Sequence, residues 1–133
     1  RDIDHALELG ADGVQIASRF VTTAECDAAE EYKQAYINAK KEDIQIIQSP
    51  VGMPGRALRN EFIKGLENTR KPITKCYNCL EKCDPRSVPY CITKALIDAV
   101  RGDIENGLIF CGENVDRIHE MTTVHDLMQE LCY

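Results

Sequence analysis

Four cysteines lie close together in the middle of this chain. Cys76, Cys79, Cys83 and Cys91 follow a C-x2-C-x3-C-x7-C spacing, and two prolines stiffen the segment before the last one. Four soft sulfur ligands at such spacings come within reach of one metal ion or cluster. The spacing matches neither a bacterial ferredoxin nor a zinc ribbon, so it predicts a metal site while leaving open a 4Fe-4S cluster or zinc, with a structural role for either.

Two other interpretations of these cysteines stay open. Disulfides would need an oxidising compartment, and the chain's seven cysteines would leave an odd thiol. Free thiols packed in a core are the second alternative, because cysteine is a common small core residue. Outside the cluster, we expect Cys26, Cys111 and Cys132 to be such core thiols.

A second stretch that could do chemistry runs from Gly10 to Glu25. Residues 13–17 form an apolar run that predicts a β-strand, with Gln15 on it and the small pair Ala17 and Ser18 at its C-terminal end. A small residue followed by a hydroxyl lets backbone N–H groups approach an anion and adds a side-chain donor. The pattern indicates a phosphate-binding turn, although an ordinary strand-to-helix crossover fits the same residues.

The elements that would position these residues alternate between strand and helix. Apolar periodicity predicts strands over 13–17, 44–48 and 108–111, and helices over 2–9, 24–40, 56–67, 92–101 and from Val124 onward. Thr22 with Glu25, and Thr123 with Asp126, predict two capping boxes. Gly10 and Gly102 are expected to end two of the helices.

Composition narrows the class of protein. The 133 residues carry a net charge of −6 with basic residues scattered among acids, which argues against a nucleic-acid-binding surface. The chain has no apolar run long enough for a membrane span and no charged-then-apolar signal segment. We therefore expect a cytoplasmic protein with no nucleic-acid or membrane partner.

The stretch from Gly10 to Glu25 resembles the last βα unit of the nitronate monooxygenase family. This family is also called the 2-nitropropane dioxygenase family and includes the FMN-dependent enoyl-acyl carrier protein reductases. Residues 32–40, the run SPVGMPGRALRN at 49–60 and the run GLIFCGEN at 107–114 are similar to the family's C-terminal part, in the same order. Typical members have Gly-Thr in place of Ala17-Ser18 and carry no cysteine cluster.

The resemblance implies an α/β fold: the C-terminal fragment of an FMN-binding (β/α)8 TIM barrel, with a Cys-rich loop and a helical tail. A whole barrel takes about 250 residues, so most of its strands would lie outside this chain. Its expected parts are 1–50, the last strand-helix unit and following segment; 51–75, a Gly/Pro turn and helix; 76–91, the metal-binding loop; and 92–133, the tail.

For the residues, the resemblance implies that Gln15, Ala17 and Ser18 contribute to FMN binding. It implies no catalytic residue here, because His5, His119 and His125 match no family motif and are expected at the surface. Three residues of the GRALRN run, Arg56, Arg59 and Asn60, are expected to pair with carboxylates or cap carbonyls rather than contact a ligand.

For the parent enzyme, the resemblance implies an FMN-dependent oxidoreductase, a nitronate monooxygenase that oxidises alkyl nitronates, its small-molecule substrates, with dioxygen. The alternative is reduction of an enoyl thioester on acyl carrier protein with NAD(P)H. An alternative of another class is a non-catalytic, metal-stabilised fragment, which could form a homo-oligomer through exposed apolar surface. We expect the fragment alone to be inactive.

Overall fold

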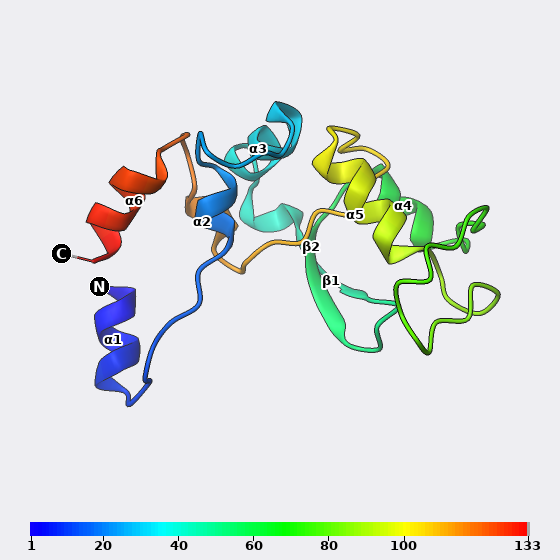
Figure 1. Cartoon of the computed structure of the whole chain (residues 1–133), viewed down its shortest axis with the longest axis horizontal. Helices are drawn as coiled ribbons and strands as arrows, with labels where there is room; N and C mark the ends of the chain where they lie inside the picture. Colours follow the sequence, from blue (N-terminus) through cyan, green and yellow to red (C-terminus); the bar gives the residue numbers. More distant parts are fainter. Residues whose placement is uncertain (133) are drawn as a thin grey trace.

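The computed structural model describes residues 1–132, which form an open arch of mixed α and β structure (Figure 1). Helices α1 and α6 lie at one end of the arch, and α4, α5 and the loop between them lie at the other. In chain order the elements are α1 (Asp2–Glu8), α2 (Ser18–Val21), α3 (Glu30–Ile37), η1 (Lys41–Asp43), β1 (Ile44–Gln48), β2 (Pro54–Leu58), α4 (Glu61–Leu66), α5 (Ile92–Val100), η2 (Val115–Arg117) and α6 (Val124–Leu131).

A small sheet stands at the centre of the arch. Strands β1 and β2 pair antiparallel, with Ile44 opposite Leu58, and a turn with Gly52 at φ 86° joins them. The segment after α5 runs along the free side of β2, where the Leu58 N–H donates to the Ile109 carbonyl at 2.9 Å. A single bridge joins Ala57 to Phe110. The expected strand over 44–48 is thus confirmed, and 108–111 is extended but makes only this bridge.

The core lies on both sides of β2, because successive residues of a strand point to opposite faces. Leu58 and Ile109 pack on one side with Tyr36, Ala99, Val115 and Ile118. Ala57 and Leu108 pack on the other side with Phe62, Ile63, Tyr90 and Ala95. No helix among the described residues has the length and apolar character needed to cross a bilayer.

The helix expected over 56–67 is wrong at its start. Residues 56–58 belong to β2, and α4 begins only at Glu61, with Asn60 as its N-cap. Strand pairing prevails there because it places Ala57 and Leu58 in the two halves of the core, where both are buried.

The N-terminal expectations also need correction. Residues 13–17 have no regular secondary structure, because within the described chain no strand pairs with them. The helix expected over 24–40 is α3, which begins at Glu30. Thr22 is no N-cap; it is buried, and its hydroxyl donates to the Arg19 carbonyl. Glu25 accepts instead from the N–H of Val124 at 3.0 Å.

The remaining helix boundaries agree with the sequence. Helix α1 is followed by Gly10 at φ 95°, and α5 by Gly102 at φ 104°. The Thr123 hydroxyl accepts from the Asp126 N–H at 3.1 Å, which caps α6. Next to this cap, Thr122 and Thr23 form a parallel bridge that joins the two ends of the chain's fold.

Candidate functional site

The predicted phosphate-binding turn is open to solvent. Ala17 precedes α2 and Ser18 is its first residue, and both Ala17 and Gln15 are exposed. The Ser18 Oγ accepts the N–H of Gly112 at 3.0 Å. The structure therefore places Ala17 and Ser18 beside the turn at 112–114, which is ninety-four residues later in the chain.

Two basic side chains lie at that second turn. Arg56 Nη2 stands 3.7 Å from the Glu113 carboxylate, and Lys41 Nζ donates to the Glu113 carbonyl at 2.9 Å. The structural roles expected for Arg56, Arg59 and Asn60 agree with the structure. Besides the Arg56 contact, Arg59 pairs with Glu67 at 3.3 Å and Asn60 caps α4. These contacts hold the 112–114 turn against β2 while leaving Ser18 part-exposed.

A tyrosine pair beneath the turn was not found by sequence reasoning. Tyr36 is buried, and its hydroxyl donates to the Phe110 carbonyl at 2.6 Å, while the Tyr32 and Tyr36 hydroxyls are 2.9 Å apart. Burial raises the pKa of Tyr36 well above its ordinary value, so the phenol stays protonated as a donor. Their four-residue spacing on α3 predicted a buried face but not this contact.

Burial has the same effect on the neighbouring thiol. It raises the pKa of Cys111 to about 11, with Arg56 acting in the opposite direction. Cys111 is half-buried and packs against the core, as expected. Cys26 is half-buried without belonging to either half of the core, and Cys132 is exposed, so its expected core position is wrong. All three histidines are exposed, as expected.

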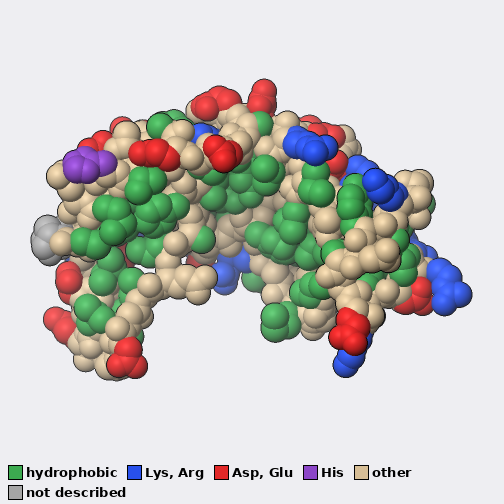
Figure 2. Space-filling view, viewed as in Figure 1, with side chains coloured by type: hydrophobic (Ala, Val, Ile, Leu, Met, Phe, Trp, Pro, Cys, Tyr) green, Lys and Arg blue, Asp and Glu red, His purple; other side chains and the backbone are tan. Residues whose placement is uncertain are grey.

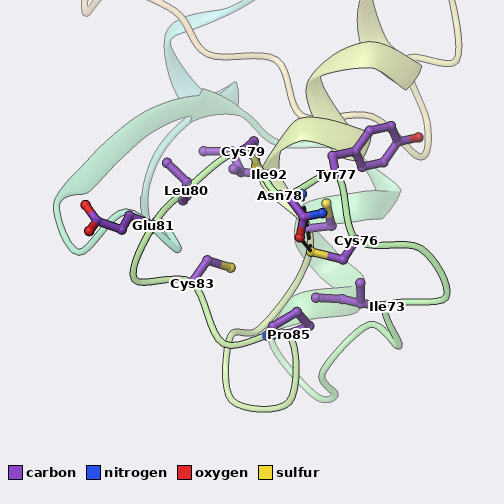
Figure 3. Close-up of a pocket in the computed structure, with 11 residues that line it drawn as sticks. Ile73, Cys76, Tyr77, Asn78, Cys79, Leu80, Glu81, Cys83, Pro85 and Ile92 are labelled. Atoms are coloured by element: carbon purple, nitrogen blue, oxygen red, sulfur yellow. Dashed lines mark hydrogen bonds between the residues drawn. The ribbon is translucent and has the colours of Figure 1, made fainter.

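The cysteine-rich loop forms a pocket of about 250 Å³, and all four of its cysteines line it (Figure 3). All four are free thiols. The pKa of Cys83 is raised by desolvation and then by the negative charge of Cys76, Cys79 and Cys91. In the described part of the chain, no three His, Cys, Asp or Glu side chains are arranged to hold a metal ion. The loop thus gathers the cysteines around one pocket without converging their sulfurs.

The predicted phosphate-binding turn has hydrogen-bond donors of the kind that an FMN phosphate needs. The Ser18 hydroxyl accepts one hydrogen bond from Gly112 and retains its own O–H for an acceptor. As the first residues of α2, Ser18 and Arg19 have N–H groups without an intrahelical acceptor. The exposed methyl side chain of Ala17 leaves room for approach. The residues present therefore fit one end of this cofactor.

Comparison with known proteins gives a consistent result. A family model described as nitronate monooxygenase matches residues 1–133. The chain is similar to a probable nitronate monooxygenase of Bacillus subtilis, with 26% identity over 99% of the chain and 36% of the relative. A probable nitronate monooxygenase of Staphylococcus saprophyticus is 36% identical over 47% of the chain and 18% of the relative.

Solved structures extend the similarity to the fold. A mutant of FabK from Thermotoga maritima aligns with a TM-score of 0.71 and 25% identity, covering 97% of this chain and 35% of that one. FabK itself from the same organism aligns with a TM-score of 0.70 and 26% identity, covering 93% and 37%. The chain thus spans about a third of the length of the relatives that it matches from end to end.

Proposed function

Because the chain belongs to the nitronate monooxygenase family, we propose that it forms part of an FMN-dependent oxidoreductase that oxidises alkyl nitronates with dioxygen. The match of the family model to residues 1–133 carries this proposal. FMN, when bound, accepts the electrons that leave the substrate carbon.

In this proposal Gln15, Ala17 and Ser18 form one wall of the flavin site. Ser18 donates its O–H to a phosphate oxygen, and the N–H groups of Ser18 and Arg19 add two further donors. The hydrogen bond from Gly112 to Ser18 Oγ supports this role, because it fixes the position of the hydroxyl oxygen. Gln15 is exposed three residues before Ser18 and would contact the same ligand. The chain contributes binding and orientation, and no catalytic residue is assigned to it.

The test is made on the full-length protein that contains these residues. We expect it to purify with FMN and to consume dioxygen when given an alkyl nitronate. Replacing Ser18→Ala removes one hydrogen bond to the phosphate, which should weaken FMN binding about five- to tenfold. Ser87→Ala is the matched control, because Ser87 is exposed in the cysteine-rich loop and hydrogen-bonds only locally.

Two outcomes would contradict the proposal. A full-length protein that neither carries nor binds FMN would remove the oxidoreductase assignment, and an unchanged FMN affinity in Ser18→Ala would remove Ser18 from the site. Reduction of an enoyl thioester with NAD(P)H, in the absence of nitronate oxidation, would assign the alternative activity instead.

A further inference from the structure

The cysteine-rich loop provides a site that the flavin chemistry does not use. We propose that Cys76, Cys79, Cys83 and Cys91 bind one metal centre through four thiolates. Zinc and an iron-sulfur cluster share this ligand chemistry. The proposal does not depend on flavin binding or on the substrate.

The first argument is that all four cysteines line one pocket. Cys76 and Cys79 come from the extended part of the loop, Cys83 from the turn after it, and Cys91 from the residue that precedes α5 (Figure 3). The remaining lining is mostly apolar, with one amide and one carboxylate: Ile73, Tyr77, Asn78, Leu80, Glu81, Pro85 and Ile92. Seven cysteines are present, and these four are the ones that share a pocket.

The second argument is the local geometry of the first two cysteines. Asn78 adopts φ 51°, and its N–H points back to the Cys76 Sγ at 3.4 Å. A backbone N–H donated to sulfur stabilises the thiolate form, which is the form that binds metals. The Cys76–Cys79 segment therefore already has an N–H contact to sulfur, of the kind found between two cysteines that bind one metal.

The third argument is that the other side of the loop is fixed. The Arg70 guanidinium donates to the carbonyls of Pro85, Arg86 and Val88, and the Lys71 N–H donates to Pro89 at 2.9 Å. Tyr90, next to Cys91, is buried and bonds the Gln48 carbonyl. Cys83 and Cys91 are thus held at the two ends of an anchored segment, and the Cys76–Cys79 segment lies across the same pocket from them.

Closure of the loop would move the sulfurs onto one centre. Residues 72–79 contain no helix or strand, so no regular element has to break when Cys76 and Cys79 move toward Cys83. Loading with metal removes the thiol protons to water, and the binding free energy then orders the loop. The expected function of the centre is to stabilise residues 67–91, where helices and strands are lacking.

The test begins with the full-length protein purified without oxygen, chelators or metal-affinity resin. We expect one metal centre per chain by elemental analysis. One zinc in a colourless protein identifies a zinc site, and a brown protein with iron and acid-labile sulfide identifies a cluster. Absence of both metals, with no uptake of Zn²⁺ or of iron and sulfide on reconstitution, would overturn the proposal.

Alkylation mapped by mass spectrometry gives a readout that needs no variant. Cys76, Cys79, Cys83 and Cys91 should resist labelling until a chelator is added, whereas exposed Cys132 should react in either case. Equal labelling of all five with and without chelator, or disulfides among the four, would count against the site.

Variants then identify the ligands. Cys79→Ser and Cys83→Ser should each weaken metal binding by more than about tenfold, while Cys26→Ser should retain it. Undiminished metal content in both cluster variants would refute the assignment.

Discussion

The buried hydroxyl of Tyr36 makes one contact that we expect to matter for stability. It donates to the Phe110 carbonyl at 2.6 Å, next to the turn that meets Ser18. Tyr36→Phe leaves this carbonyl without its donor, which should lower the free energy of unfolding by about 1 to 2 kcal/mol in urea titrations. Tyr32→Phe is the matched control with a smaller expected loss, because Tyr32 bonds only Tyr36. Equal losses of unfolding free energy in the two variants would show that the hydrogen bond to Phe110 adds no stability of its own.

The thiol of Cys111 gives a prediction about pH. Its pKa of about 11 in the folded protein exceeds the ordinary value of 9.0, because burial disfavours the thiolate. The folded state therefore holds this proton more tightly than the unfolded state. Its contribution to stability is complete below about pH 9 and is lost as the pH rises toward 11.

The rate of alkylation as a function of pH tests whether the pKa of Cys111 is raised. Cys111 should react far more slowly than exposed Cys132 at about pH 8 and should accelerate only in the alkaline range. Similar rates for the two thiols at neutral pH would contradict the raised pKa.

At the scale of elements, Asn60 connects α4 to the chain that follows α5. Its Oδ1 accepts from the Ile63 N–H at 3.0 Å, and its Nδ2 donates to the carbonyls of Ile104 and Gly107 at 2.6 and 2.8 Å. Asn60→Ala removes an N-cap and two further bonds and should cost about 3 kcal/mol. Thr123→Ala removes only the cap of α6 and should cost about 1 kcal/mol. Thermal denaturation measures both losses of stability. A larger loss for Thr123→Ala than for Asn60→Ala would contradict this interpretation.

Gly107 allows close packing between α5 and the segment that runs beside β2. A Cβ at this position would lie 2.5 Å from the Ala99 Cα. Gly107→Ala should therefore destabilise the fold by about 2 to 3 kcal/mol, because the helix backbone cannot move aside freely. Gly13→Ala has open space around it and should change stability by less than about 0.5 kcal/mol. Chemical denaturation of the two variants measures these changes in stability. If neither variant were destabilised, the argument from close packing at Gly107 would be wrong.

Elements governed by local interactions were predictable from the sequence, and those governed by distant partners were not. Gly10, Gly102 and Thr123 end or begin helices through contacts within a few residues, and the structure agrees. Strand β2 depends on pairing with β1 and on the segment at 108–111, so its residues were taken for a helix. Thr22 is also determined by distant partners, because its burial in the fold overrides its preference for capping a helix.

The candidate sites divide in the same way. The spacing of the four cysteines was enough to predict that they gather, because sulfurs so near in sequence can reach one centre when the loop folds back, and all four line one pocket. The contact between Ser18 and Gly112 spans ninety-four residues and has no signature in either segment. Its partners could be named only once the fold was known.

At the scale of the whole molecule, one side of the arch is hollow and carries apolar side chains. Figure 2 shows hydrophobic patches across this view, with the α1 end standing away from the hairpin. Leu9 is 76% exposed at that end, and Ile46 and Met53 are 59% and 69% exposed on the hairpin. Exposed apolar area of this kind favours burial against further protein.

That open shape leads to a prediction about cofactor affinity. In the proposed flavin site the 133-residue chain supplies one wall, so its Kd for FMN on its own should be weaker than about 1 µM. Quenching of FMN fluorescence measures this directly, with the full-length protein as the positive control. Sub-micromolar binding by the short chain would mean that residues 1–133 form a complete flavin site.

The bridge between Thr23 and Thr122 also has a consequence for biosynthesis. Arg19 and Glu25 bind groups on α6, so the segment around α2 is secured by residues that lie about a hundred positions later. While the polypeptide is still emerging from the ribosome, this segment lacks its closing partner. Its apolar surface is then available to chaperones until α6 has been translated.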